Sequence, residues 1–247
     1  MSLTVPGFPL HAFAEYFEEL AFSTIFEDRC LALEAIVRSF GFEQFVYLWM
    51  KDPSHPAPHD ASNFIAVDFR DRHWVEEYNS CGLAAHDPVR LATRDQYTPI
   101  LYEHAPIFNN AQARFMDRAR VDGQQHNGLC FALPSAGGGQ SGFGAVERDE
   151  VPSEAVILGV LSAVKAFHLL ADAEFTETRA REVGISPSEL RILIAIKSGL
   201  RSRQVANEFG LTEGYINNVM SDLRRRFGKG NTAALLAYLE RAGVMRT

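Results

Sequence analysis

The chain has 247 residues, of which 47% are hydrophobic, so it is long enough for one large globular domain or two modest ones. Its net charge of -7 excludes a uniformly basic nucleic-acid-binding protein. The average hides an asymmetry, because residues 178–247 hold 12 basic and 6 acidic side chains, whereas residues 1–177 hold 12 basic and 25 acidic ones. This pattern predicts an acidic domain joined to a small basic one, and the basic one is the candidate for contacts with phosphates.

Aromatic, β-branched and amphipathic patterns alternate in the first part of the chain. Apolar residues recur at helical spacing over residues 10–39, and strands are predicted at 42–50 and 64–69. Residues 73–120 have a mainly helical but irregular pattern that prolines interrupt. This order of elements favours a sheet with helices packed on its faces.

A β-hairpin and a long helix are predicted next. Residues 128–134 and 143–147 have strand patterns on either side of a glycine-rich run. A phosphate-binding loop is the alternative, but no GK[ST] motif or directly following helix supports it. A helix is expected over residues 153–175, and the charged run 176–184 is the expected linker. We therefore expect an α+β fold, with residues 1–175 forming an α/β/α sandwich around an antiparallel sheet.

Residues 185–247 have the signals of four short helices. Ser186 and Glu189 form a capping box with a proline at the first helical position, and Gly199 ends that helix. SRQVANEFG is the second helix, Thr212 caps the third, and NTAALLAYLERAG is a fourth that can close the bundle and pair with its copy in a dimer. A helix, a glycine turn and a second helix form the helix-turn-helix arrangement, whose second member enters the major groove of DNA.

The third predicted helix has one apolar side and one polar, basic side. The apolar stripe consists of Ile216, Val219, Met220 and Leu223. Polar side chains opposite it can reach base edges, while basic ones can hold phosphates. A solvated helix end is the alternative interpretation, and the neighbouring caps and turn make it less favoured. The candidates for DNA contact are Arg203, Thr212, Asn217, Asn218, Ser221, Arg224, Arg225, Arg226 and Lys229.

The segment from SPSEL to ERAGVM resembles the helix-turn-helix output domain of LuxR-type transcription regulators over about 60 residues. The positions that match that pattern are Glu189, Gly199, Val205, Ala206, Leu211, Ile216 and Gly243. LRSRQVA replaces the usual KT..EIA, and Gly214-Tyr215 stands where Thr is frequent. These departures concern the DNA sequence that would be read, not the fold.

The front part resembles the autoinducer-binding domain of the quorum-sensing LuxR subfamily. LuxR-type output domains also follow phosphorylated receivers, but a receiver would open with a strand ending in paired acidic residues, and residues 1–120 do not follow that pattern. HWVEEYNSCGLAAHDPV at residues 73–89, followed by TPILYEH, carries the resemblance, which extends more weakly from about residue 15 to 165. It implies a small-molecule signal, such as an N-acyl-homoserine lactone, and no other cofactor.

The residue types in this stretch complement a homoserine lactone. The lactone offers two carbonyl acceptors and an amide N–H, which an indole, a phenol and a carboxylate can satisfy inside an apolar pocket. The resemblance implies that Trp74 donates to the lactone carbonyl, that Asp87 accepts the amide N–H, and that Tyr78 packs against the ligand. Tyr102 stands where the family usually has a tryptophan, and Gly128 matches the glycine that begins one of its strands.

Two departures from the family concern the acyl part of the ligand. Arg70 stands four residues before Trp74, where several family receptors have a tyrosine that binds the acyl carbonyl. The strand GFGAV lacks the hydroxyl group that often binds the same carbonyl. They imply an unusual acyl group, for example a branched or aromatic one, or a ligand that is not a lactone. Arg70 and Tyr47 complete the set of ligand-binding candidates.

Plainer interpretations and other functions stay open. A tryptophan and a tyrosine four residues apart often face a core, and an aspartate before proline is common in turns. An enzyme could use His73, Cys81, His86 and Asp87, but no GxSxG, HExxH or cysteine motif supports one. A regulator whose front domain senses a protein partner, or folds without ligand, would have the same helix-turn-helix features at residues 185–247.

The three cysteines form no CxxC pair, which is typical of reduced thiols rather than of a disulfide framework or a metal site. No signal peptide or run of 18 apolar residues is present in the sequence. We therefore expect a soluble, cytoplasmic regulator that is not an enzyme, makes no membrane contact, and binds an inverted-repeat operator as a homodimer.

Overall fold

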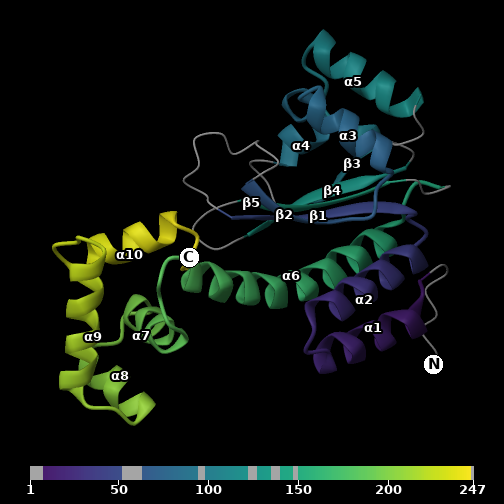
Figure 1. The fold of residues 1–247 in the computed structure, drawn as a ribbon. Coiled ribbons are helices and arrows are strands. Elements are labelled where there is room, and N and C mark those ends of the chain that lie inside the picture. Colours follow the sequence, from purple (N-terminus) through teal and green to yellow (C-terminus); the bar gives the residue numbers. More distant parts are fainter. Residues whose placement is uncertain are drawn as a thin grey trace. The chain divides into compact units, whose positions relative to one another are not determined.

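The chain forms two compact units that divide inside one long helix, between Ala171 and Asp172. The computed structural model describes residues 8–51, 63–93, 98–121, 127–134, 140–146 and 150–245. The N-terminal unit contains a sheet with helices, and the C-terminal unit is helical (Figure 1). The glycine-rich turn predicted between the hairpin strands is only partly described: residues 140–142, which were expected in the turn, already belong to the second strand (Gln140–Val146), and residues 135–139 lie outside the described residues.

A five-stranded antiparallel sheet in the order β2-β1-β5-β4-β3 forms the centre of the described N-terminal unit. Its strands are β1 (Gln44–Met50), β2 (Phe64–Asp68), β3 (Ile100–Leu101), β4 (Leu129–Pro134) and β5 (Gln140–Val146). One face carries α1 (Leu10–Phe22), α2 (Phe26–Ser39) and α6 (Glu154–Glu182), and the other carries α3 (Arg72–Ser80), α4 (Pro88–Thr93) and α5 (Asn110–Val121) (Figure 1). The expected antiparallel sheet between helical layers is confirmed.

The core of this unit lies between the sheet and α6. Tyr47 and Phe167 pack edge to face with their ring centroids 5.0 Å apart, and both are buried. Burying one phenylalanine side chain stabilises a fold by about 1.5–3 kcal/mol. Tyr16 of α1 donates a hydrogen bond of 2.8 Å to the carbonyl oxygen of Ala163. By length and composition α6 could also cross a membrane, but residues such as Val160 and Phe167 use its apolar face as core.

Helix α6 continues through the segment 176–184 that the sequence suggested as a linker. Apolar periodicity stops there, but Glu, Arg and Ala are good helix formers, and Arg179 pairs with Glu182 at 2.9 Å. Arg179 Nε also donates to the carbonyl of Ala242 at 3.1 Å, and Ala180 is buried in the core of the C-terminal unit. The expected linker is therefore helical up to Glu182, and its last turns pack with the C-terminal unit.

Four helices follow at the predicted places, and one apolar cluster joins them. They are α7 (Pro187–Lys197), α8 (Ser202–Phe209), α9 (Glu213–Arg226) and α10 (Thr232–Arg241). Ser186 accepts the backbone N–H of Glu189, and Glu189 accepts that of Ser186, so the predicted capping box is present. Thr212 accepts the N–H of Tyr215 at 3.2 Å, which begins α9 as predicted.

Candidate functional site

The two faces of β1 differ in how fully they are covered. Its alternate residues are buried on the face packed against α6, whereas Val46 and Leu48 point to the opposite face and are half-buried. In β5 these two residues lie opposite Gly144 and Gly142. Because glycine brings no side chain, this face has a thinner side-chain layer beneath α3 and α4.

Helix α3 presents Trp74 and Tyr78 on the same side, one turn apart. Asp71 caps the helix by accepting the N–H groups of His73 at 2.9 Å and Trp74 at 3.1 Å. The two rings lie 6.0 Å apart, and Trp74 is buried against Phe115 of α5. Within the described part of the chain, the indole N–H of Trp74 donates to no acceptor. It is therefore a hydrogen-bond donor that a ligand can use.

Asp87 is buried and held in one orientation at the start of α4. Its Oδ1 accepts the backbone N–H groups of Val89 at 3.0 Å and Arg90 at 3.1 Å, while its Oδ2 accepts the phenol O–H of Tyr78 at 3.0 Å. Burial raises the pKa of Asp87, although the hydrogen bonds from Arg90 and Tyr78 oppose this shift. Since a carboxylate oxygen can accept two hydrogen bonds, Oδ2 can still accept a ligand N–H.

Tyr102 lies over the glycine-containing face of the sheet, in the short 3-10 helix η3 (Tyr102–His104). Its backbone N–H donates to the carbonyl of Gly128 at 3.0 Å. A Cβ atom at Gly128 would lie 2.5 Å from the Tyr102 ring, so only glycine fits there. Burial raises the pKa of Tyr102, and Cys130 and Asp87 raise it further, because both lie in the same surroundings. Tyr102 therefore joins the group around Asp87.

Arg70 enters this group from the end of β2. Its guanidinium group binds both carboxylate oxygens of Asp68, with distances of 2.8 Å and 2.7 Å. The same guanidinium lies 5.7 Å from the centre of the Tyr78 ring. Burial acts to lower the pKa of Arg70, but the hydrogen bonds and charge of Asp68 outweigh it and raise the pKa. A permanent positive charge therefore lies beside the Tyr78–Asp87 pair.

Tyr47 does not join these residues. It lies on the opposite face of the sheet, where its O–H is 2.8 Å from Nδ1 of His168, and His168 Nε2 is 2.6 Å from the carbonyl oxygen of Pro134. Side chains alternate between the faces of a strand, so Tyr47 points away from the glycine-containing face to which Val46 points. Five of the six predicted ligand-binding residues are thus brought together, and Tyr47 instead ties β1 to α6.

Thr93 and Cys130 belong to the same surroundings, although no sequence motif marks them. The Thr93 hydroxyl lies 4.0 Å from the Cys130 sulfur, and Cys130 lies opposite Gly144. Burial raises the pKa of the Cys130 thiol to about 12, so it stays protonated. Strand alternation in β4 was the signal that could have placed Cys130 on this face. Among the described residues, no three His, Cys, Asp or Glu side chains gather as metal ligands.

Helices α8 and α9 are joined by a short turn at Gly210. This glycine has φ of 66°, a left-handed conformation that most residues avoid, and the N–H of Leu211 returns to the carbonyl of Ala206 at 2.8 Å. Ile216 and Met220 of α9 are buried in the cluster formed with α7, α8 and α10. The predicted inner stripe of this helix is confirmed, and its opposite side is free to face a partner.

The predicted DNA-contact residues fall into two groups. Arg203, Asn217, Asn218, Ser221 and Arg225 are exposed, and Thr212 is exposed while its hydroxyl caps α9. Three other basic residues have partners on neighbouring helices, whereas Arg225 pairs with Asp222 of its own helix. Arg224 donates to the Thr232 hydroxyl at 3.2 Å, Lys229 lies 4.3 Å from the centre of the Tyr238 ring, and Arg226 binds Glu189.

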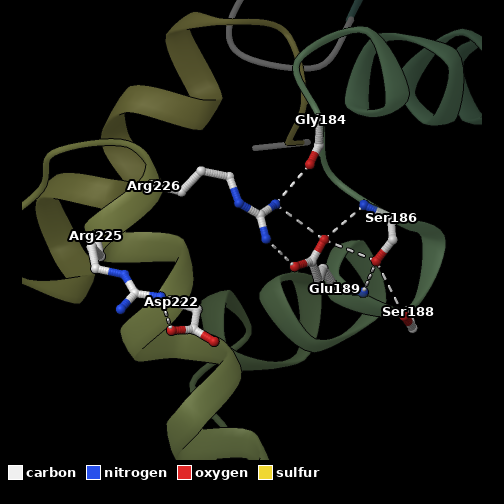
Figure 2. Close-up of polar contacts among 7 residues, drawn as sticks. All are labelled: Gly184, Ser186, Ser188, Glu189, Asp222, Arg225 and Arg226. Carbon is white, nitrogen blue, oxygen red and sulfur yellow. Dashed lines mark hydrogen bonds and ion pairs between the residues drawn. The ribbon is translucent and has the colours of Figure 1, made fainter.

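Arg226 connects the end of α9 to the start of α7. Figure 2 shows its guanidinium group directed at Glu189 and Gly184, while Arg225 points to Asp222. Arg226 donates to both oxygens of Glu189, the closer at 2.8 Å, and to the carbonyl of Gly184 at 2.7 Å. Arg226 therefore uses its guanidinium group to hold the two helices together. This arrangement does not favour the phosphate contact that was expected for Arg226.

Replacing Arg226 with alanine should lower the melting temperature by a few degrees, because an ion pair that joins two helices is lost. Arg225→Ala is the matched control and should leave the melting temperature unchanged, since its pair with Asp222 is exposed. Burial acts to raise the pKa of Glu189, but the hydrogen bonds from Arg226 and Ser186 outweigh it and lower the pKa. The stabilisation is therefore complete above the ordinary pKa of a glutamate and is lost as the pH falls through the lowered value. Equal melting temperatures for the two variants at neutral pH would contradict the assignment.

The model of the autoinducer binding domain family matches residues 26–175. This range is more than half of the chain and contains every residue of the group around Asp87. The chain belongs to the autoinducer-binding domain family. The resemblance of its N-terminal unit to LuxR-type quorum-sensing regulators is thereby confirmed. A search of curated protein sequences found no match.

Solved structures with a similar fold include those of SdiA and CepR2. Escherichia coli SdiA is 14% identical, with a TM-score of 0.52, and the match covers 96% of this chain and 99% of SdiA. SdiA in complex with octanoyl-rac-glycerol matches at 16% identity and a TM-score of 0.52, covering 99% of both chains. CepR2 from Burkholderia cenocepacia, an N-acylhomoserine lactone-dependent LuxR family transcription factor, is 19% identical, with a TM-score of 0.50. It covers 67% of this chain and 94% of its own. The SdiA matches show that this chain and SdiA share a fold along nearly their whole length.

Proposed function

We propose that this protein is a ligand-responsive transcriptional regulator. It binds an N-acyl-homoserine lactone or a related small signal in its N-terminal unit and promoter DNA through its C-terminal unit. The observation that carries the proposal is the group formed by Trp74, Tyr78, Asp87 and Tyr102 on the thinly covered sheet face. These residues come from three separate elements and supply polar groups complementary to those of a lactone. All four lie within the residues that match the autoinducer binding domain family.

Each polar group of a lactone has a counterpart in this group. The indole N–H of Trp74 can donate to the ring carbonyl, and Oδ2 of Asp87 can accept the amide N–H. Tyr78 fixes the Asp87 carboxylate, so the acceptor is in position before the ligand arrives. The rings of Trp74 and Tyr102 offer apolar surface for the lactone ring, and Gly142 and Gly144 leave space for the acyl chain.

The C-terminal unit supplies the DNA-binding part of the proposal. Asn217, Asn218 and Ser221 share the exposed side of α9 with Arg225, so polar and basic groups lie where a recognition helix needs them. One short helix contacts too few base pairs to be selective, so the protein acts as a homodimer on an inverted repeat with half-sites about one helical turn apart. Neither proposed step is enzymatic.

A regulator that senses a ligand other than a lactone is the second candidate. Arg70 replaces a tyrosine that binds the acyl carbonyl in several family receptors. SdiA, which shares the fold, was solved with octanoyl-rac-glycerol, an acyl ester without a lactone ring. The acyl chain and its carbonyl are common to both ligand classes, so the same sheet face suits either.

The test is the melting temperature of the purified protein with N-octanoyl-L-homoserine lactone or 1-octanoyl-glycerol. A ligand at one hundred times its Kd adds about 2.7 kcal/mol of stability, and the lactone should therefore raise the melting temperature by several degrees. Trp74→Phe keeps an aromatic side chain and removes the indole N–H donor, so the rise in its melting temperature should be smaller. A rise with the glycerol ester alone would favour the second candidate, and no rise with either would contradict ligand sensing of this kind.

A further inference from the structure

One side of α1 carries a row of exposed apolar side chains, spaced four, three and four residues apart. The row consists of Leu10, Ala14, Phe17 and Ala21. Leu10 is 63% exposed and Phe17 is 38% exposed. Residues at this spacing share one side of a helix, so the four form a continuous apolar stripe rather than scattered surface residues. A continuous exposed apolar surface is typical of a site that binds a partner.

Helix α1 is held in place by residues outside the stripe. Tyr16 and Leu20 are buried, Tyr16 donates its hydrogen bond to the carbonyl of Ala163 in α6, and the rings of Phe13 and Phe40 pack edge to face 6.1 Å apart. The stripe is therefore presented on an anchored helix. Large and small residues alternate along it, so the positions of Ala14 and Ala21 leave gaps. Large side chains of another helix can fit into such gaps.

The charges beside the stripe have one sign. Residues 8–28 contain five acidic side chains and no lysine or arginine. Glu15, Glu18 and Glu19 are exposed on α1, and Glu27 and Asp28 are exposed in the first turn of α2. Glu18 borders the stripe directly, because it follows Phe17 and lies one turn after Ala14. A helix that docks here should therefore have basic residues beside its apolar ones.

We infer that the stripe of α1 is a docking surface for a basic amphipathic helix of a partner protein. Such a helix lays its apolar side on the stripe, and its lysines or arginines complement the glutamates. A second copy of α1 would bring like charges together, and the same glutamates would be repelled by an anionic membrane surface. Helix α1 and the candidate ligand site lie on opposite faces of the sheet, so a partner and a ligand can bind together (Figure 1).

The test uses the full-length protein and a designed helical peptide of about three heptads, with leucines along one side and lysines beside them. A matched peptide has glutamates in place of the lysines. Fluorescence anisotropy should show the lysine peptide binding at least about tenfold more tightly than the glutamate peptide. The double variant Ala14→Gln, Ala21→Gln fills the gaps with a good helix former. It should weaken the lysine peptide about tenfold and leave the melting temperature unchanged.

Two controls separate docking on the stripe from general stickiness and charge. Phe108→Gln changes an aromatic residue that is 81% exposed outside α1, and it should bind the lysine peptide like the wild type. Glu15→Lys, Glu18→Lys should make the glutamate peptide the tighter one. Glu43→Lys, Glu208→Lys makes the same change in net charge at exposed positions outside α1 and should keep the wild-type order.

Several outcomes would overturn the inference and leave the proposed function intact. They are weak or equal binding of the two peptides by the wild type, unchanged binding by the variant with filled gaps, and a reversed order in both charge variants. Loss of a dimer in the variant with filled gaps, measured by sedimentation, would instead assign the stripe to a second copy. Wild-type binding to phosphatidylcholine vesicles that this variant loses would assign the stripe to a membrane.

Discussion

Replacing Asp87 with alanine should weaken lactone binding roughly tenfold to several hundredfold, because a ligand N–H in a dry site loses a charged acceptor. The same change should lower the stability of the free protein. Val89 and Arg90 lose the oxygen that caps α4, and a lost cap costs about 0.5–2 kcal/mol. Titration with N-octanoyl-L-homoserine lactone and thermal unfolding without ligand measure the two effects separately.

Asp87→Asn separates the ligand effect from the structural one. Its amide oxygen can still cap α4, and its NH₂ group can donate to the Tyr78 hydroxyl, so the fold should change little. The NH₂ group cannot accept the ligand N–H, so binding should still be lost. Since burial raises the pKa of Asp87, wild-type affinity should also fall on acidification from a pH above the ordinary range of an aspartate. If Asp87→Ala and Asp87→Asn both bind the lactone with wild-type affinity, Asp87 does not bind the ligand and is only a turn residue.

Changes at the exposed side of α9 should have effects of similar size on DNA binding. Asn217→Ala should remove about 1–3 kcal/mol of base discrimination in each half-site, and a dimer carries the change twice. Arg225→Ala should instead weaken all DNA sequences similarly and reduce the slope of affinity against salt by about one per subunit. Gel-shift titrations on operator and unrelated DNA at two or more salt concentrations measure both changes.

Arg181→Ala is the matched control for the DNA prediction. It removes the same charge from an exposed position of α6, outside the proposed recognition helix, and should alter operator affinity much less than Arg225→Ala. Equal losses for Arg181 and Arg225 would point to general charge attraction rather than to a recognition helix. Unchanged operator affinity in both the Asn217 and Arg225 variants would contradict the placement of α9 at DNA.

Features that depend on neighbouring residues could be predicted from the sequence. The capping box of Ser186 and Glu189, the Thr212 cap and the glycine turn before α9 each need only a few consecutive positions. The apolar stripe of α9 likewise follows from helical spacing within that helix. For the same reason, Trp74 and Tyr78 could be placed together, because residues four apart share one side of a helix.

Features that depend on distant partners could not be predicted in this way. The face to which Tyr47 points is set by the pairing of β1 with β5 and by the packing of α6, so its sequence position alone does not exclude it from the site. Arg226 could not be distinguished from Arg225 until Glu189, 37 residues earlier, was placed beside it. The strand β3 has only two residues, too few for any periodicity.

The continuation of α6 into the C-terminal unit determines where this protein can be cut for domain exchange. A fusion joined after residue 182 would remove Ala180, which packs in the apolar core of the C-terminal unit. It would also remove Arg179, which donates a hydrogen bond to the carbonyl oxygen of Ala242. A fusion joined at Asp172 would keep both with the helices that they stabilise. The exchangeable module is therefore longer than its four short helices, and a hybrid regulator with a foreign sensor should inherit the end of α6 from this chain.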